Sequence, residues 1–96
     1  MNILVTYDVD TVSEKGQKRL RQVARICMNY GQRVQNSVFE CEVTDVQFTI
    51  LKNLLQNAMD SRLDSIRLYH LNKNKNHFIE TLGKKTSYDV NEPIIL

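Results

Sequence analysis

The chain has 96 residues, of which 42% are hydrophobic and 25% charged, and its formal net charge at pH 7 is +2. This length provides one hydrophobic core, and the composition is that of an ordinary globular protein, which excludes a disordered or collagen-like chain. No apolar run approaches the roughly 20 residues that span a bilayer, and the N-terminus lacks an export signal. We therefore expect one domain over residues 1–96, located in the cytoplasm and without a membrane partner.

The cysteines and histidines do not form a recognisable metal-binding motif. Cys27 and Cys41 lie in apolar sequence contexts, and we expect buried free thiols rather than a disulfide or a zinc site. His70 and His77 have no partner at the spacing of metal ligands, so we expect each to be structural or solvated.

The first predicted strand covers residues 3–9, a short run rich in β-branched and aromatic side chains. A helix is expected between Ser13 as N-cap and Gly31, because apolar residues recur there at helical spacing. At about 100° per residue, four cations fall together on the face opposite the apolar stripe. This basic ridge consists of Lys15, Lys18, Arg21 and Arg25.

The remaining pattern predicts two further strands, a helix and a last strand. Residues 31–44 favour a hairpin that turns near Asn36 and Ser37, with one long bent strand as the alternative. Residues 44–47 read TDVQ, a capping box at the start of a second helix, and the alternation over residues 65–71 predicts another strand. The order β-α-β-β-α-β indicates an α+β domain of ferredoxin-like fold, with both helices on one face of a mostly antiparallel sheet.

Apolar side chains on the sheet face that carries no helix have to be shielded from water by something that packs on them. We expect that Val5, Tyr7, Phe39 and Cys41 cannot all point toward the helices, so that a second copy packs on the open face and forms a homodimer. Residues 1–71 are then the core, and residues 72–96 are a C-terminal extension. We expect its apolar end, residues 92–96, to add an extra strand to a sheet edge and, where that edge is the partner's, to interlock the dimer.

Asp8 is the carboxylate best placed for chemistry, because the end of a strand holds a side chain rigidly and leaves it accessible. One carboxylate binds Mg²⁺ poorly, but two copies of Asp8 facing each other across a two-fold axis would suit one hydrated ion. The alternative is that Asp8 and Asp10 only begin a turn and help to cap the helix. The basic ridge likewise has two interpretations: its cations contact phosphates, or it is merely a solvated helix face.

Three segments resemble one known family. They are residues 6–9 (TYDV), 19–24 (RLRQVA) and, above all, 30–41 (YGQRVQNSVFEC). Together they resemble the CRISPR-associated protein two family, the smaller of the two proteins that acquire new spacers. The resemblance covers nearly the whole chain, and it implies a ferredoxin-like homodimer that bridges two dimers of the larger CRISPR integrase subunit and supports the incoming DNA.

The resemblance also implies a metal-dependent endonuclease that cleaves single-stranded RNA or double-stranded DNA, with Asp8 holding Mg²⁺ or Mn²⁺ at the dimer axis. Tyr7 and Arg33 join Asp8 as candidate catalytic residues, and Ser37 and Phe39 flank the site. The candidate nucleic-acid-binding residues are the basic ridge together with Arg19 and Arg33. The alternative is a non-catalytic dimeric DNA-binding scaffold whose nuclease site is vestigial.

Overall fold

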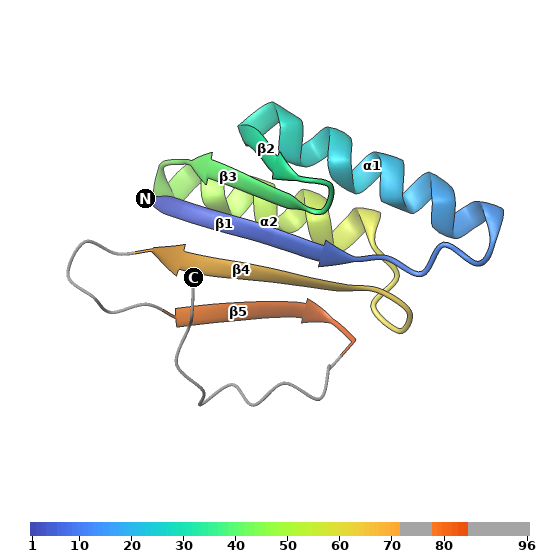
Figure 1. The fold of residues 1–96 in the computed structure, drawn as a ribbon. Coiled ribbons are helices and arrows are strands. Elements are labelled where there is room, and N and C mark those ends of the chain that lie inside the picture. Colours follow the sequence, from blue (N-terminus) through green and yellow to red (C-terminus); the bar gives the residue numbers. More distant parts are fainter. Residues whose placement is uncertain (72–77, 85–96) are drawn as a thin grey trace.

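The structure is a computed structural model, and it describes residues 1–71 and 78–84 (Figure 1). In chain order the elements are β1 (Asn2–Asp8), α1 (Glu14–Tyr30), β2 (Gly31–Gln35), β3 (Val38–Glu42), α2 (Asp45–Ala58), β4 (Ser65–Leu71) and β5 (Phe78–Gly83). The predicted ferredoxin-like order β-α-β-β-α-β is confirmed, and a fifth strand follows it.

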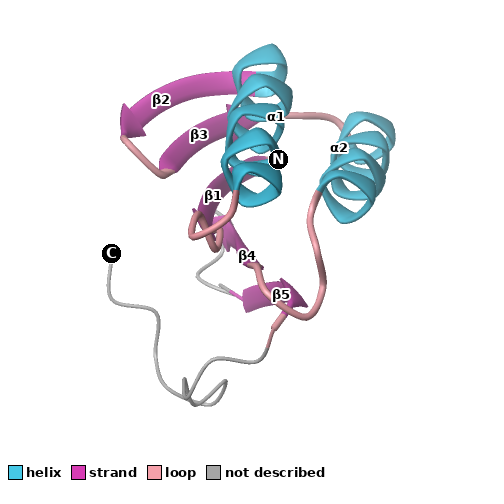
Figure 2. Ribbon diagram, turned by 90° about the vertical axis from the view of Figure 1, so that its right-hand side faces the viewer, coloured by secondary structure: helices cyan, strands magenta, loops and turns pink. Residues whose placement is uncertain are grey.

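The five strands form one antiparallel sheet in the order β2-β3-β1-β4-β5. Both helices lie on the same face of this sheet, and the other face carries no helix, as Figure 2 shows. We call this second face the open face. Because β1 lies between β3 and β4, its C-terminal residue Asp8 is presented near the middle of the sheet rather than at an edge.

The local signals for helices and turns are confirmed. The Ser13 side chain accepts the Gly16 N–H at 3.1 Å and caps α1, and Thr44 and Gln47 form the predicted capping box of α2. β2 and β3 are the two arms of a hairpin, with a shift in register between Arg33 and Gln35. The alternative of one long bent strand is therefore wrong.

The expectation that Val5, Tyr7, Phe39 and Cys41 cannot all face the helices is wrong. All four are buried on the helix side, with at most 6% of the residue exposed. The register pairs Val5 with Phe39, and partners in an antiparallel ladder project from the same face, so these positions line one core. A second copy is therefore not needed to cover them, and a dimer has to be argued from the residues of the open face.

β5 was not predicted, because Glu80 interrupts the apolar side of its pattern. Alternation along the strand places Glu80 on the helix side, where its carboxylate accepts from Lys52 Nζ at 2.8 Å and lies 2.6 Å from His70 Nε2. These two partners allow a carboxylate to stand where an apolar residue is expected. The structural role expected of His70 is confirmed, whereas His77 and the expected strand over residues 92–96 lie outside the described residues.

The two cysteines are free and buried, as expected. Burial is the main cause that raises the pKa of Cys27 to about 12 and that of Cys41 to about 11. Both side chains therefore act as small apolar groups of the core. Within the described ranges, no helix is long and apolar enough to cross a membrane.

Candidate active site and nucleic-acid surface

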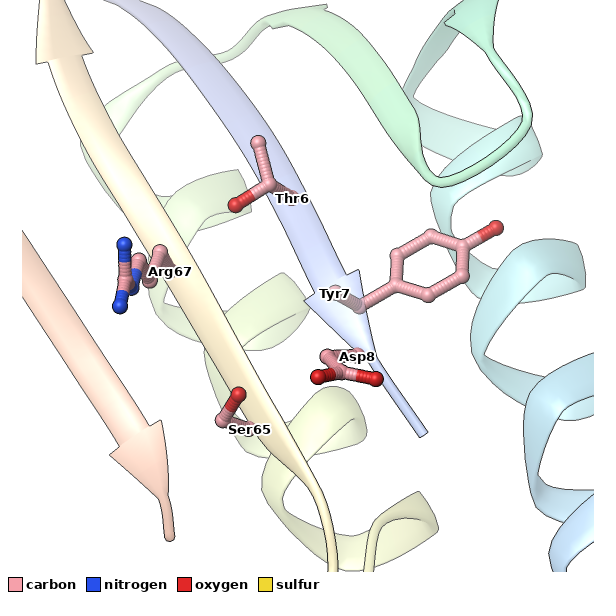
Figure 3. A pocket seen from close by; sticks show the side chains of 5 residues that line it. All are labelled: Thr6, Tyr7, Asp8, Ser65 and Arg67. Carbon is pink, nitrogen blue, oxygen red and sulfur yellow. The ribbon is translucent and has the colours of Figure 1, made fainter. Parts of the chain in front are cut away.

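Asp8 lies at the end of β1, opposite Ser65 of β4, and its side chain is exposed on the open face. Thr6 and Arg67 form the next register pair on the same face, because side chains two residues apart project alike. These residues line a shallow hollow of about 230 Å³ (Figure 3). The end of β1 thus presents a carboxylate in an open, polar depression that also contains two hydroxyl groups and a guanidinium.

Tyr7 points to the other side of β1, toward the helices (Figure 3). Its ring stacks on Phe39 with 6.1 Å between centroids, and the Arg33 guanidinium carbon lies 5.1 Å from the Phe39 centroid. The Tyr7 hydroxyl donates to the Asn36 carbonyl at 3.1 Å. Burial raises the pKa of Tyr7, and the hydrogen bond with Arg33 opposes this only in part. The structure therefore brings Tyr7, Arg33 and Phe39 together but separates their side chains from that of Asp8.

Ser37 belongs to the turn between β2 and β3 and is partly exposed. Its carbonyl accepts the Tyr7 N–H at 3.1 Å. This backbone bond continues the contact between β1 and the hairpin one residue past the last register pair, Thr6 with Val38. Ser37 thus supports the strand that bears Asp8 through its main chain.

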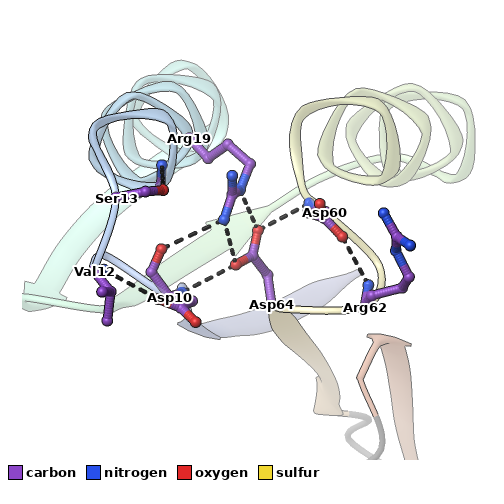
Figure 4. Close-up of polar contacts among 8 residues, drawn as sticks. Asp10, Val12, Ser13, Arg19, Asp60, Arg62 and Asp64 are labelled. Atoms are coloured by element: carbon purple, nitrogen blue, oxygen red, sulfur yellow. Dashed lines mark hydrogen bonds and ion pairs between the residues drawn. The ribbon is translucent and has the colours of Figure 1, made fainter.

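Arg19 is engaged in an ion pair instead of being presented to solvent (Figure 4). Its Nε donates to Asp64 Oδ2 at 2.8 Å, and its Nη2 donates to Asp64 Oδ1 at 3.3 Å and to the Asp10 carbonyl at 3.4 Å. Only 16% of the Arg19 side chain is exposed, and the Asp64 side chain is fully buried. Arg19 therefore differs from the residues of the basic ridge, with which it was grouped from the sequence.

The four residues of the basic ridge are all exposed. Lys18, Arg21 and Arg25 line a broad surface hollow along α1 of about 390 Å³. Because the apolar stripe of α1 packs on the sheet, the ridge points away from the sheet. The cations and Asp8 consequently lie on opposite sides of one chain.

The described residues of one chain do not form a metal site by themselves. In residues 1–71 and 78–84, no group of three or more His, Cys, Asp and Glu side chains is arranged to hold an ion. The Asp10 carboxylate accepts the Val12 N–H at 3.0 Å, so its expected role in a turn is confirmed, while the helix cap is Ser13. Asp8, exposed at a strand end, fits the way Mg²⁺ binds proteins, through one or two carboxylates and several waters.

Sequence reasoning missed Thr6, Ser65 and Arg67 as residues of the Asp8 hollow. The signal was present, since the alternation over residues 65–71 places Ser65 and Arg67 on one face. What the sequence pattern lacked was the register between β1 and β4, which sets Asp8 opposite Ser65. Long-range register depends on the whole core and on turn geometry, so it is not contained in either strand alone.

The fold and the site define a ferredoxin-like domain with one exposed carboxylate at the end of its central strand. Comparison with known proteins identifies the family within this class of domain. The sequence profile described as CRISPR associated protein Cas2 matches residues 1–77, and the chain belongs to this family.

Two curated relatives are similar over the full length. The chain is 52% identical over 95 residues to a CRISPR-associated endonuclease Cas2 of Halalkalibacterium halodurans, with 99% of each chain covered. It is 46% identical over 96 residues to a CRISPR-associated endoribonuclease Cas2 of Moorella thermoacetica, with 100% of each covered. Among solved structures, a crystal structure of Streptococcus pyogenes Cas2 at pH 6.5 superposes with a TM-score of 0.71 at 57% identity, covering 77% of this chain and 89% of that one.

Proposed function

We propose that this chain is a metal-dependent endonuclease of CRISPR adaptation that works as a symmetric homodimer, with Asp8 as the ligand of Mg²⁺ or Mn²⁺. The observation that carries the proposal is the position of Asp8, exposed in a polar hollow at the end of the central strand. The names of the full-length relatives, an endonuclease and an endoribonuclease, support phosphodiester cleavage as the reaction. The substrate is single-stranded RNA or double-stranded DNA.

The open face supports the dimer. It carries partly exposed apolar side chains from four adjacent strands, which a second copy would cover. These are Leu4, Val38, Tyr69 and Ile79. A two-fold axis passing near the ends of the β1 strands would bring the two Asp8 carboxylates together and supply the second ligand that one chain lacks.

The chain's own groups define the rest of the mechanism. A bound divalent ion would activate water and offset the charge that develops on the phosphate. Arg67 lies in the hollow with Asp8, where a guanidinium suits the recognition of phosphate oxygens. Tyr7 of β1 and Arg33 of β2 contribute indirectly, from the helix side of the sheet, since their contacts with Phe39 support the neighbouring strand that presents Asp8.

A second role is that of a platform that binds DNA and the larger CRISPR integrase subunit. The platform acts in the cytoplasm, where foreign DNA is captured. The exposed basic ridge favours this role, because cations along a helix bind phosphates without reading sequence. Since the ridge points away from the Asp8 hollow, the platform role does not require Asp8. In the scaffold alternative, the dimer performs only this second role.

A cleavage assay separates the two roles. Labelled single-stranded RNA and double-stranded DNA are incubated with and without Mg²⁺, using the unaltered protein, Asp8→Asn and the control Glu40→Gln, which neutralises another exposed carboxylate of the open face. All three proteins are first shown to have the same oligomeric state. We expect cleavage only with metal and only by the unaltered protein and Glu40→Gln. Equal cleavage by Asp8→Asn, which would then come from a contaminant, or no cleavage by any of the three proteins would overturn the nuclease role of Asp8 and leave the scaffold.

A further inference from the structure

The last residues of β1 keep fewer ladder contacts than its middle, although the Tyr7 N–H still donates to the Ser37 carbonyl. Register with β3 ends at Thr6, and register with β4 ends at the pair of Asp8 and Ser65. Asp8 is therefore the last ladder residue, where strands ordinarily fray. A side chain that has to keep one fixed position at such an end needs a further constraint on the chain that follows it.

The ion pair of Arg19 and Asp64 supplies that constraint, two residues past Asp8. The Asp10 N–H donates to Asp64 Oδ1 at 3.0 Å, and the Asp10 carbonyl accepts from Arg19 Nη2 at 3.4 Å. Both backbone groups of Asp10 are thus bound by members of one ion pair (Figure 4). Asp64 directly precedes Ser65, which pairs with Asp8. The ion pair of Arg19 and Asp64 therefore links β4 to the chain that follows β1, immediately beyond the last register pair of these two strands.

This arrangement is rigid on the Asp64 side. The buried carboxylate also accepts the Asp60 N–H at 2.8 Å, and the Asp64 carbonyl accepts the Lys84 N–H at 2.7 Å. Asp64 is therefore fixed by the turn before β4 and by the end of β5. A buried ion pair seldom stabilises a protein more than a well-packed apolar pair of the same size, so its value is better sought in the geometry that it fixes.

We propose that Arg19 and Asp64 are positioning residues for Asp8, which hold Asp10 and thereby fix the carboxylate where a divalent ion binds. The inference rests on the proposed function and assigns Arg19 a role different from direct contact with nucleic acid. It predicts that loosening the ion pair weakens metal binding although neither residue touches the ion.

The test uses Arg19→Lys, which keeps the charge beside Asp64 but loses the guanidinium fork that also reaches Asp10. Glu80→Gln is the matched control, since it weakens a second partly buried ion-pair network, between α2, β4 and β5. Two quantities are measured on each folded protein: amide hydrogen exchange over residues 9–13, and Mn²⁺ affinity from the paramagnetic signal of the free ion.

We expect Arg19→Lys to lose exchange protection over residues 9–13 and to bind Mn²⁺ about tenfold more weakly, the size of effect typical of residues that orient a metal ligand. Glu80→Gln should leave both quantities as in the unaltered protein. Unchanged exchange or unchanged Mn²⁺ affinity in Arg19→Lys would overturn the positioning role alone. No Mn²⁺ binding by the unaltered protein would overturn the proposed metal site and, with it, this inference.

Discussion

Replacing Gly16 by alanine should affect stability in the opposite direction to the usual glycine-to-alanine change in a helix. In a helix interior that change ordinarily stabilises a protein by about 1 kcal/mol. Gly16 is buried in the first turn of α1, and an added Cβ would lie 1.9 Å from the Asp10 carbonyl oxygen. The obstacle is backbone, which the ion pair of Arg19 and Asp64 holds in place, so it cannot rotate away.

The structure therefore predicts that Gly16→Ala destabilises the protein. Overpacking costs about 1–3 kcal/mol, and a Cβ placed 1.9 Å from a backbone oxygen belongs at the upper end of this range. After subtracting the helix-propensity gain of about 1 kcal/mol, we expect a net loss of about 2 kcal/mol. For a domain of this size, that corresponds to a fall in Tm on the order of 10 °C.

Urea unfolding followed by circular dichroism measures this loss at one fixed protein concentration, because the stability of the proposed dimer would depend on concentration. Gln22→Ala, at an exposed position of the same helix, is the control and should be neutral or slightly stabilising. An unchanged or higher urea midpoint for Gly16→Ala would refute the close approach of α1 to Asp10 on which this reasoning depends.

Three further predictions follow from the charges and thiols. Burial raises the pKa of Asp64 and of Glu80, but hydrogen bonds, of which those from Arg19 and Lys52 are the strongest, outweigh it and leave both pKa values below normal. The stabilisation from these carboxylates is present above the unfolded pKa of about 4 and is lost as pH falls through the folded pKa values. The urea concentration at the midpoint should therefore decrease as the pH is lowered below about 5, and a midpoint independent of pH would contradict this. Cys27 and Cys41, buried with raised pKa values, should react with a thiol reagent at pH 8 only after unfolding; rapid labelling of the native protein would show that the core is open. Charge reversal along the basic ridge should weaken binding to double-stranded DNA and reduce its salt dependence, and an unchanged salt slope would show that the ridge does not contact phosphates.

Local chemistry made most of the fold predictable. The Ser13 cap, the capping box from Thr44 to Gln47 and the hairpin turn are each encoded within a few residues, and the structure contains all three. β5 was missed because the inward Glu80 is tolerated only through Lys52 and His70, which come from other elements. A strand whose pattern depends on distant partners cannot be recognised from its own residues.

The same limit applied to the site. Asp8 could be singled out because a carboxylate at a strand end is visible in the sequence, but its neighbours in the hollow follow from the register of β1 and β4. Likewise, Arg19 belongs to a basic segment, and only the fold reveals that Asp64, 45 positions away, binds it. Tyr7 and Asp8 are adjacent in sequence, yet strand alternation sends their side chains to opposite faces.

The proposed pairing of Asp8 across a two-fold axis is tested most directly by the stoichiometry of metal binding. Mn²⁺ is titrated into the unaltered protein and into Asp8→Asn of the same oligomeric state, and the free ion is quantified by electron paramagnetic resonance, from which the bound ion follows by difference. We predict about one ion per two chains, lost in Asp8→Asn, because two carboxylates would share one hydrated ion. One ion bound by each chain, or binding that Asp8→Asn leaves unchanged, would contradict a shared site at Asp8.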